Sequence, residues 1–170
     1  MTAPAANAAE HAVAVRASGA VARNLPSINP ATGLATDYLN HFTEAVMLLE
    51  MGISMPDCLE DLRAWSPKTY VEHFARSNFT DRDTVIAAYE AADPRVRDAL
   101  ESTTQTLNNV LAEARDVVLG HLAAPDGAAL ALRAAAWVKP LIARAAAIIN
   151  GTRPAGAGGT QAAVDALFER

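Results

Sequence analysis

The sequence predicts an all-α protein: a helical bundle built on a long antiparallel helix hairpin, with several short helices. Apolar residues recur at three- and four-residue spacing through long stretches, as on the buried face of an α-helix. Alanine, which has the highest helix propensity, dominates the apolar residues that make up 51% of the chain. No stretch of any length shows the alternating apolar and polar residues that mark a half-buried β-strand.

The longest predicted helix opens at Asp93-Pro94 and continues to about residue 123. One of its faces follows an alternating spacing of four and three residues, through Val96, Leu100, Thr103, Leu107, Val110, Ala114, Val117 and His121. A turn at 124–127 precedes a second helix over 128–150, which stops at Gly151. Two long helices with a short connection predict an antiparallel hairpin. Pro140 is expected to kink its second arm.

A further helix is expected over 34–51, because apolar residues again recur at helical spacing. Its apolar face consists of Tyr38, Leu39, Phe42, Ala45, Val46 and Leu49. Start signals predict three short helices, over 54–64, 66–77 and 80–92. The helix over 34–51 is expected to pack along the hairpin, and the three short helices are expected to cover one end of it.

These elements divide the chain into a flexible N-terminal arm (1–33), a helical bundle domain (34–150) and a C-terminal segment (151–170). The C-terminal segment consists of a Gly-rich linker and a short helix with Val164, Leu167 and Phe168 on one side. An isolated helix of that length is marginal in water and needs a surface to dock on. We expect it to dock on a neighbouring subunit of a homo-oligomer.

Composition excludes several classes of partner. The chain has 14 basic and 19 acidic residues, and the basic residues form no cluster. A nucleic-acid or anionic membrane surface requires concentrated positive charge, so we expect no nucleic-acid partner. No run approaches the roughly 18 apolar residues of a membrane span. Cys58 is the only cysteine, which rules out an internal disulfide and suits a reducing compartment. We expect a soluble cytoplasmic protein.

The candidate metal site is formed by Asp37, His41 and Glu44. On a helix these residues fall within a sector of about 60°, so two carboxylates and one imidazole share a face. Metal-binding bundles use such sets, and a transition metal is the cofactor they would hold. Against this, the sector lies more than about 100° from the apolar face, where solvated residues belong. A Glu-His pair three residues apart, such as His41 and Glu44, is one half of a di-iron carboxylate site, which needs a second Glu-x-x-His from another helix. No such second motif appears in the chain.

The remaining notable side chains have structural explanations. His41 is a poor phosphoacceptor, because the neighbouring Glu44 would repel a phosphoryl group. His121 lies near a helix C-terminus, where the helix dipole favours it. Trp65 and Trp137 supply the volume that an Ala-rich bundle needs, so both are expected in the core.

Two segments, ATGLATDYLNHF (31–42) and MPDCLEDLRAW (55–65), resemble small uncharacterised α-helical proteins of alphaproteobacteria. This resemblance implies no activity, and no catalytic motif was found along the chain. The first hypothesis is therefore a non-enzymatic helical interaction or regulatory protein that self-associates. The second is a metal- or small-ligand-binding bundle, such as an oxidoreductase, that uses Asp37, His41 and Glu44.

Overall fold

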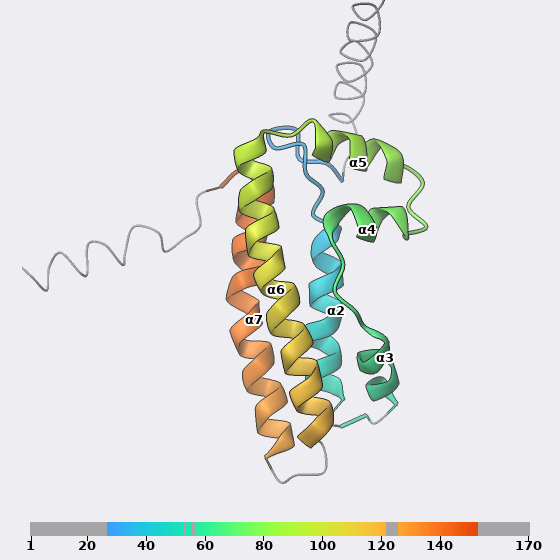
Figure 1. The fold of residues 1–170 in the computed structure, drawn as a ribbon, viewed down its shortest axis with the longest axis vertical. Coiled ribbons are helices and arrows are strands. Elements are labelled where there is room, and N and C mark those ends of the chain that lie inside the picture. Colours follow the sequence, from blue (N-terminus) through green and yellow to red (C-terminus); the bar gives the residue numbers. More distant parts are fainter. Residues whose placement is uncertain (1–26, 53, 56, 122–125, 153–170) are drawn as a thin grey trace, which may run out of the picture.

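A computed structural model describes residues 27–52, 54–55, 57–121 and 126–152. Helices dominate these residues, which confirms the all-α class (Figure 1). The helices are α2 (Tyr38–Met51), α3 (Cys58–Ala64), α4 (Tyr70–Ala75), α5 (Arg82–Glu90), α6 (Pro94–His121) and α7 (Gly127–Ile149). The β-type pairing within the described ranges is limited to one bridge, between Ile28 and Ala35. None of the described helices is long and apolar enough to cross a membrane.

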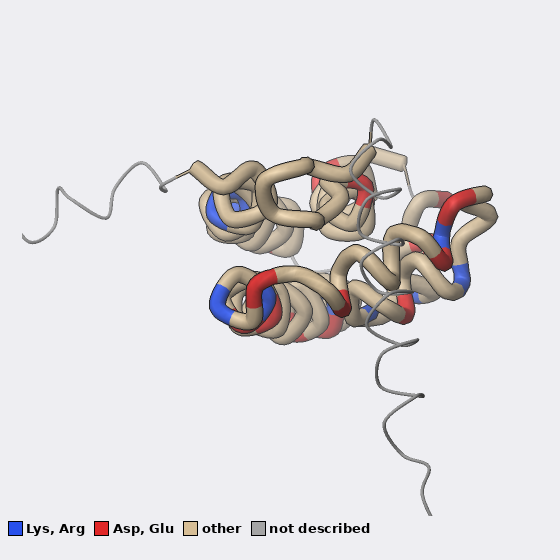
Figure 2. Tube along the Cα trace, turned by 90° about the horizontal axis from the view of Figure 1, so that it is seen from above, with Lys and Arg blue, Asp and Glu red and all other residues tan. Residues whose placement is uncertain are grey.

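The centre of the fold consists of α2, α6 and α7. Figure 1 shows α6 and α7 side by side and running in opposite directions, and α7 also packs along α2. Seen from above in Figure 2, α3, α4 and α5 lie to one side of these helices. The short helices were expected to cover one end of the bundle, but α3 and α4 lie along its side, α3 beside the lower part of α2 and α4 beside its upper part. The remaining short helix, α5, lies above α4, level with the upper end of α6 (Figure 1). This position decides which residues of α2 are buried.

The packed part of the chain begins before α2. Ile28 and Thr32 are buried, although both belong to the segment that was expected to be a flexible arm. The Thr32 hydroxyl donates a hydrogen bond to the carbonyl oxygen of Ile149, which ties this segment to the end of α7. Gly33 turns the chain with a φ of 73°, and a Cβ at this position would lie 3.2 Å from the Ala88 carbonyl oxygen. After this turn Ala35 forms the bridge with Ile28 and the Leu34 carbonyl accepts a hydrogen bond from the Asn29 N–H, so α2 begins at Tyr38 and not at residue 34.

The start of α4 is fixed by a capping box. Thr69 accepts a hydrogen bond from the backbone N–H of Glu72 at 3.2 Å, and the Glu72 carboxylate accepts one from the backbone N–H of Thr69 at 2.9 Å. The predicted start at Ser66-Pro67 was therefore too early. Trp65 adopts an extended conformation at the end of α3, which carries the chain across the side of α2.

Candidate functional site

The structure does not bring Asp37, His41 and Glu44 together into a site. His41 is only 2% exposed, whereas Asp37 is half-buried and Glu44 is exposed. Within the described residues, no three His, Cys, Asp or Glu side chains are grouped closely enough to hold a metal ion. The expectation that this sector of α2 faces solvent is wrong for His41. The layer of α3 and α4, with the segment between them, covers that part of the helix.

His41 lies in an aromatic cluster. Its ring stacks on that of Trp65, with centroids 4.9 Å apart and planes 19° from parallel. The ring of His73, from α4, lies 5.9 Å from that of His41. The indole N–H of Trp65 donates to the His41 carbonyl oxygen at 3.1 Å. Trp65 is buried, which confirms its predicted place in the core.

The electrostatics of this cluster keep both imidazoles neutral. Burial, together with the positive charge of Lys68, lowers the pKa of His41 to about 4. Burial and Lys68 also lower the pKa of His73, against an opposing effect of Asp37. The Nε2 atom of His41 is buried and has no hydrogen-bond partner among the described groups. The histidines therefore pack as aromatic rings and are not poised as an acid or base near neutral pH.

Removing the two carboxylates should have little effect on stability. Asp37→Ala and Glu44→Ala are each expected to change the free energy of unfolding by less than about 0.5 kcal/mol, because neither side chain makes a hydrogen bond to a residue that the structure describes. His41→Ala on the same helix is the contrasting variant and should cost more than about 1 kcal/mol. Urea denaturation measures all three. A loss near 2 kcal/mol for either carboxylate would show that it has a partner.

His121 ends α6 and is exposed, with its Nδ1 atom 2.8 Å from the carbonyl oxygen of Val117. This contact joins the imidazole to the backbone of the last turn, where the helix dipole favours a histidine.

A second feature was not expected from the sequence: an apolar groove between α6 and α7, called here the outer groove. It has a volume of about 310 Å³. Its walls are formed by Val110, Glu113, Ala114, Val117 and Val118 of α6 and by Leu130, Arg133, Ala134 and Trp137 of α7. Two of these side chains, Glu113 and Arg133, are charged, and the others are apolar.

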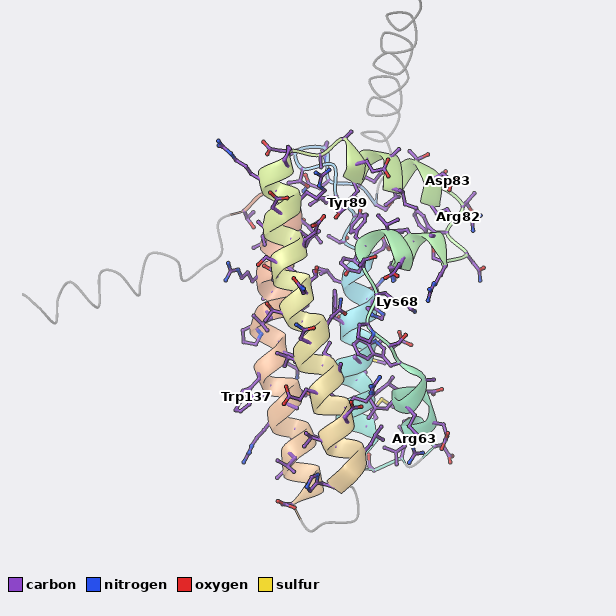
Figure 3. The ribbon with its side chains drawn as sticks, in the orientation of Figure 1. Arg63, Lys68, Arg82, Asp83, Tyr89 and Trp137 are labelled. Carbon is purple, nitrogen blue, oxygen red and sulfur yellow. The ribbon has the colours of Figure 1, made fainter. Side chains whose placement is uncertain are left out.

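Trp137 was expected in the core, and this prediction is wrong. Its side chain is 71% exposed and points away from the bundle (Figure 3). The buried residues of α7 include Ala131, Ala135 and Val138, which share one face. At 100° per residue, Trp137 lies about 160° from Ala135 and about 100° from Val138. It therefore belongs to the outer surface of α7, where it forms part of the outer groove.

The outer groove and the aromatic cluster around His41 differ in what they can do. The cluster is filled with side chains, whereas the groove is open and apolar, with a large aromatic ring at its edge. In the part of the chain that the structure describes, Lys and Arg lie at separate places rather than on one face (Figure 2).

Comparison of the chain with protein-family models, with curated proteins and with solved structures finds no match.

Proposed function

We propose that this protein is a non-enzymatic helical interaction protein that self-associates through the outer groove. In this proposal α6 and α7 act as one antiparallel hairpin that presents the groove to a second copy of the chain. The observation that supports it most strongly is the exposure of Trp137 beside an apolar groove. Tryptophan is the side chain most enriched among residues that dominate binding energy. Burying it against an apolar surface would contribute about 3 kcal/mol.

The two charged residues of the groove favour a second copy as its occupant. Glu113 lies on the α6 wall and Arg133 on the α7 wall. Glu113 is eight residues from the end of α6 and Arg133 six residues from the start of α7. At 1.5 Å per residue they lie about 12 and 9 Å from the same end of the helices. The groove thus has opposite charges on its two sides at nearly the same height.

This arrangement selects one symmetry axis for the dimer. A two-fold axis parallel to the helices places Glu113 opposite the partner's Arg133, so that both charge pairs are attractive. A two-fold axis across the helices instead places Glu113 opposite Glu113 of the partner subunit, which is repulsive. We therefore propose the first arrangement, in which α6 of one subunit packs against α7 of the other and the two Trp137 rings fill the centre.

The test is the mass of the full chain in solution, measured by sedimentation over a range of concentrations. The wild type is expected to be a dimer. Trp137→Gln should weaken the dimer at least tenfold, which corresponds to about 1.4 kcal/mol. Met47→Gln is the matched control, because Met47 is also exposed (51%) but lies on α2, outside the groove. A monomeric wild type, or a Trp137→Gln variant that remains as dimeric as the wild type, would refute the proposal.

Charge reversal tests the symmetry. Glu113→Arg and Arg133→Glu should each weaken the dimer, and the variant with both changes should recover it, because each pair is then restored with its signs exchanged. Truncation after Gly159 tests the other occupant, the C-terminal segment, whose residues lie outside the described part of the chain. If truncation alone dissociates the dimer while the groove variants leave it intact, the occupant is that segment and the proposed face is wrong.

A further inference from the structure

The chain leaves α7 on the side of the helix that carries the outer groove. Gly151 turns the chain with a φ of 66° directly after α7. The backbone N–H and the hydroxyl of Thr152 then donate hydrogen bonds to the Ala147 carbonyl oxygen, at 2.9 and 3.2 Å. This Schellman motif ends the helix and keeps Thr152 on the side of Ala147. At 100° per residue, Arg133 and Trp137 lie about 40° and 80° around α7 from Ala147.

The linker over 153–159 has the length that a return to the groove requires. The α7 wall of the groove runs from Leu130 to Trp137, which places it about 18–29 Å before the end of α7. Gly-rich linkers of seven residues span about 15 Å on average. The helix predicted after the linker, over 160–170, would be about 15 Å long. Laid back along α7, it would cover the stretch from about 15 to 30 Å before the helix end, which includes the whole groove wall.

The helix predicted over 160–170 matches the apolar character of the groove. Val164, Leu167 and Phe168 share one side of it. These side chains would lie on the apolar walls of the groove and leave solvent together with it. Asp165 and Glu169 are four residues apart, so they lie next to each other along one flank of that apolar side.

The charges of α7 complement this acidic flank. The helix contains three basic residues and no acidic one. Lys139 pairs with Glu50 of α2 at 2.6 Å. Arg133 and Arg144 are exposed, and neither forms an ion pair with a residue that the structure describes. They lie only about 20° apart around α7, on the groove side, so a docked acidic flank would face positive charge.

We propose that the segment 160–170 docks into the outer groove of its own chain and competes there with the second copy. The linker keeps the segment at a high effective concentration near its own groove. This inference rests on the proposed function, because the segment regulates the same groove. If half of the segments are docked at any moment, the apparent Kd of the dimer is raised about fourfold, since both chains must be open to pair.

Phe168→Gln in the full-length chain tests the competition. Sedimentation over a range of concentrations should show a dimer Kd at least about fourfold lower than that of the wild type, because the groove is released in both chains. Ala166→Gln is the matched control, since Ala166 lies about 160° around the predicted helix from Phe168, and its Kd should equal that of the wild type. Glu169→Lys, which would repel Arg133, should lower the Kd as Phe168→Gln does. An unchanged Kd for Phe168→Gln would overturn the proposal. A raised Kd would overturn it as well, because the segment would then bind the partner subunit.

The indole N–H signal of Trp137 in a ¹H–¹⁵N NMR spectrum measures docking without the dimer. At concentrations at which the chain is monomeric, Phe168→Gln should shift this signal, whereas Ala166→Gln should not. The signal of Trp65 should stay in place, because its indole is buried and donates to the His41 carbonyl oxygen. A Trp137 signal that does not respond to Phe168→Gln would refute docking. If the signal shifts but neither the wild type nor Phe168→Gln dimerises, self-association is wrong and docking of the segment stands.

Discussion

Replacing Leu107 by alanine is expected to lower the free energy of unfolding by about 2–5 kcal/mol, because the change would leave a cavity in the centre of the bundle. Leu107 is fully buried (0% exposed) and belongs to the core shared by α2, α6 and α7. Val110→Ala, three residues further along the same helix, is expected to cost less than about 1.5 kcal/mol. Val110 is only half-buried and lies in a wall of the outer groove, so the space left by its methyl groups opens to solvent.

The two variants distinguish the structure from the sequence pattern. The spacing of apolar residues in α6 assigns Leu107 and Val110 to the same face, whereas the structure buries only Leu107 fully. Urea denaturation of the two variants at low protein concentration measures both losses in the monomer. Equal losses would mean that the groove side of α6 is as well packed as the core side. A negligible loss for Leu107→Ala would contradict the packing of α2, α6 and α7 described above.

Much of the fold could be predicted from the sequence, because its long helices carry a long regular pattern. The predicted helix over 94–123 and the observed α6 (Pro94–His121) begin at the same residue, and the last two predicted positions, 122 and 123, lie outside the described residues. The predicted helix over 128–150 and α7 (Gly127–Ile149) differ by one residue at each end. In each of these helices many apolar residues follow helical spacing, so a single residue that departs from the pattern does not change the predicted helix. Short helices have few repeats, and the predicted start of α4 at Ser66 was replaced by the capping box at Thr69.

The exposure of Trp137 could have been predicted from the sequence. The large apolar side chain instead led to the wrong prediction that Trp137 is buried. Buried residues of α7 at 131, 135, 138, 145 and 149 follow helical spacing, and Trp137 is out of register with them. Most of those positions are alanine or valine, so the narrow face of α7 packs close to its neighbours while the largest side chain lies outside. If the helical position of Trp137 relative to the buried residues had been given more weight than the volume of its side chain, it would have been predicted on the surface, where the outer groove lies.

The burial of His41 could not be predicted from local sequence. Its neighbours in α2 are spaced as on any amphipathic helix, and its sector is polar, with Asp37 and Glu44. It is covered because the chain after α3 is extended at Trp65 and places that indole ring over the imidazole. This contact joins residues 24 positions apart in the sequence. Tertiary packing therefore decides the environment of His41, and the sequence pattern alone favoured solvent.

Because His41 is buried and neutral, the stability of the protein should fall between pH 6.5 and pH 4. In the unfolded chain the imidazole has its ordinary pKa of 6.5, whereas in the folded protein the pKa is lowered to about 4. In this window the unfolded state binds a proton that the folded state does not, so the free energy of unfolding decreases as the pH decreases. The full loss is about 3 kcal/mol, since each pKa unit corresponds to about 1.4 kcal/mol. Above pH 6.5 the contribution is fully present.

Of the groups that face His41, Lys68 and His73 lower its pKa as burial does, and the backbone at Ser66 opposes them. Lys68 and His73 both disfavour a positive charge on its ring, and the lowered pKa of His73 adds a destabilisation of the same sign on acidification. Asp37 opposes the shift at His73. A His73→Gln variant should therefore lose part of the pH dependence, and a His41→Phe variant should lose more of it.

His41→Phe tests the assignment most directly, because a phenyl ring can still stack on Trp65 but cannot take up a proton. Urea denaturation of the wild type and the variant at several pH values between 7 and 4 measures the difference. Carboxylates that titrate in the lower part of this range contribute equally to both proteins and cancel in the comparison. His121→Gln is the control, since His121 is exposed, and it should keep the pH dependence of the wild type. If His41→Phe loses stability on acidification as steeply as the wild type does, the imidazole of His41 is not the group that responds, and its burial in the folded protein would be refuted.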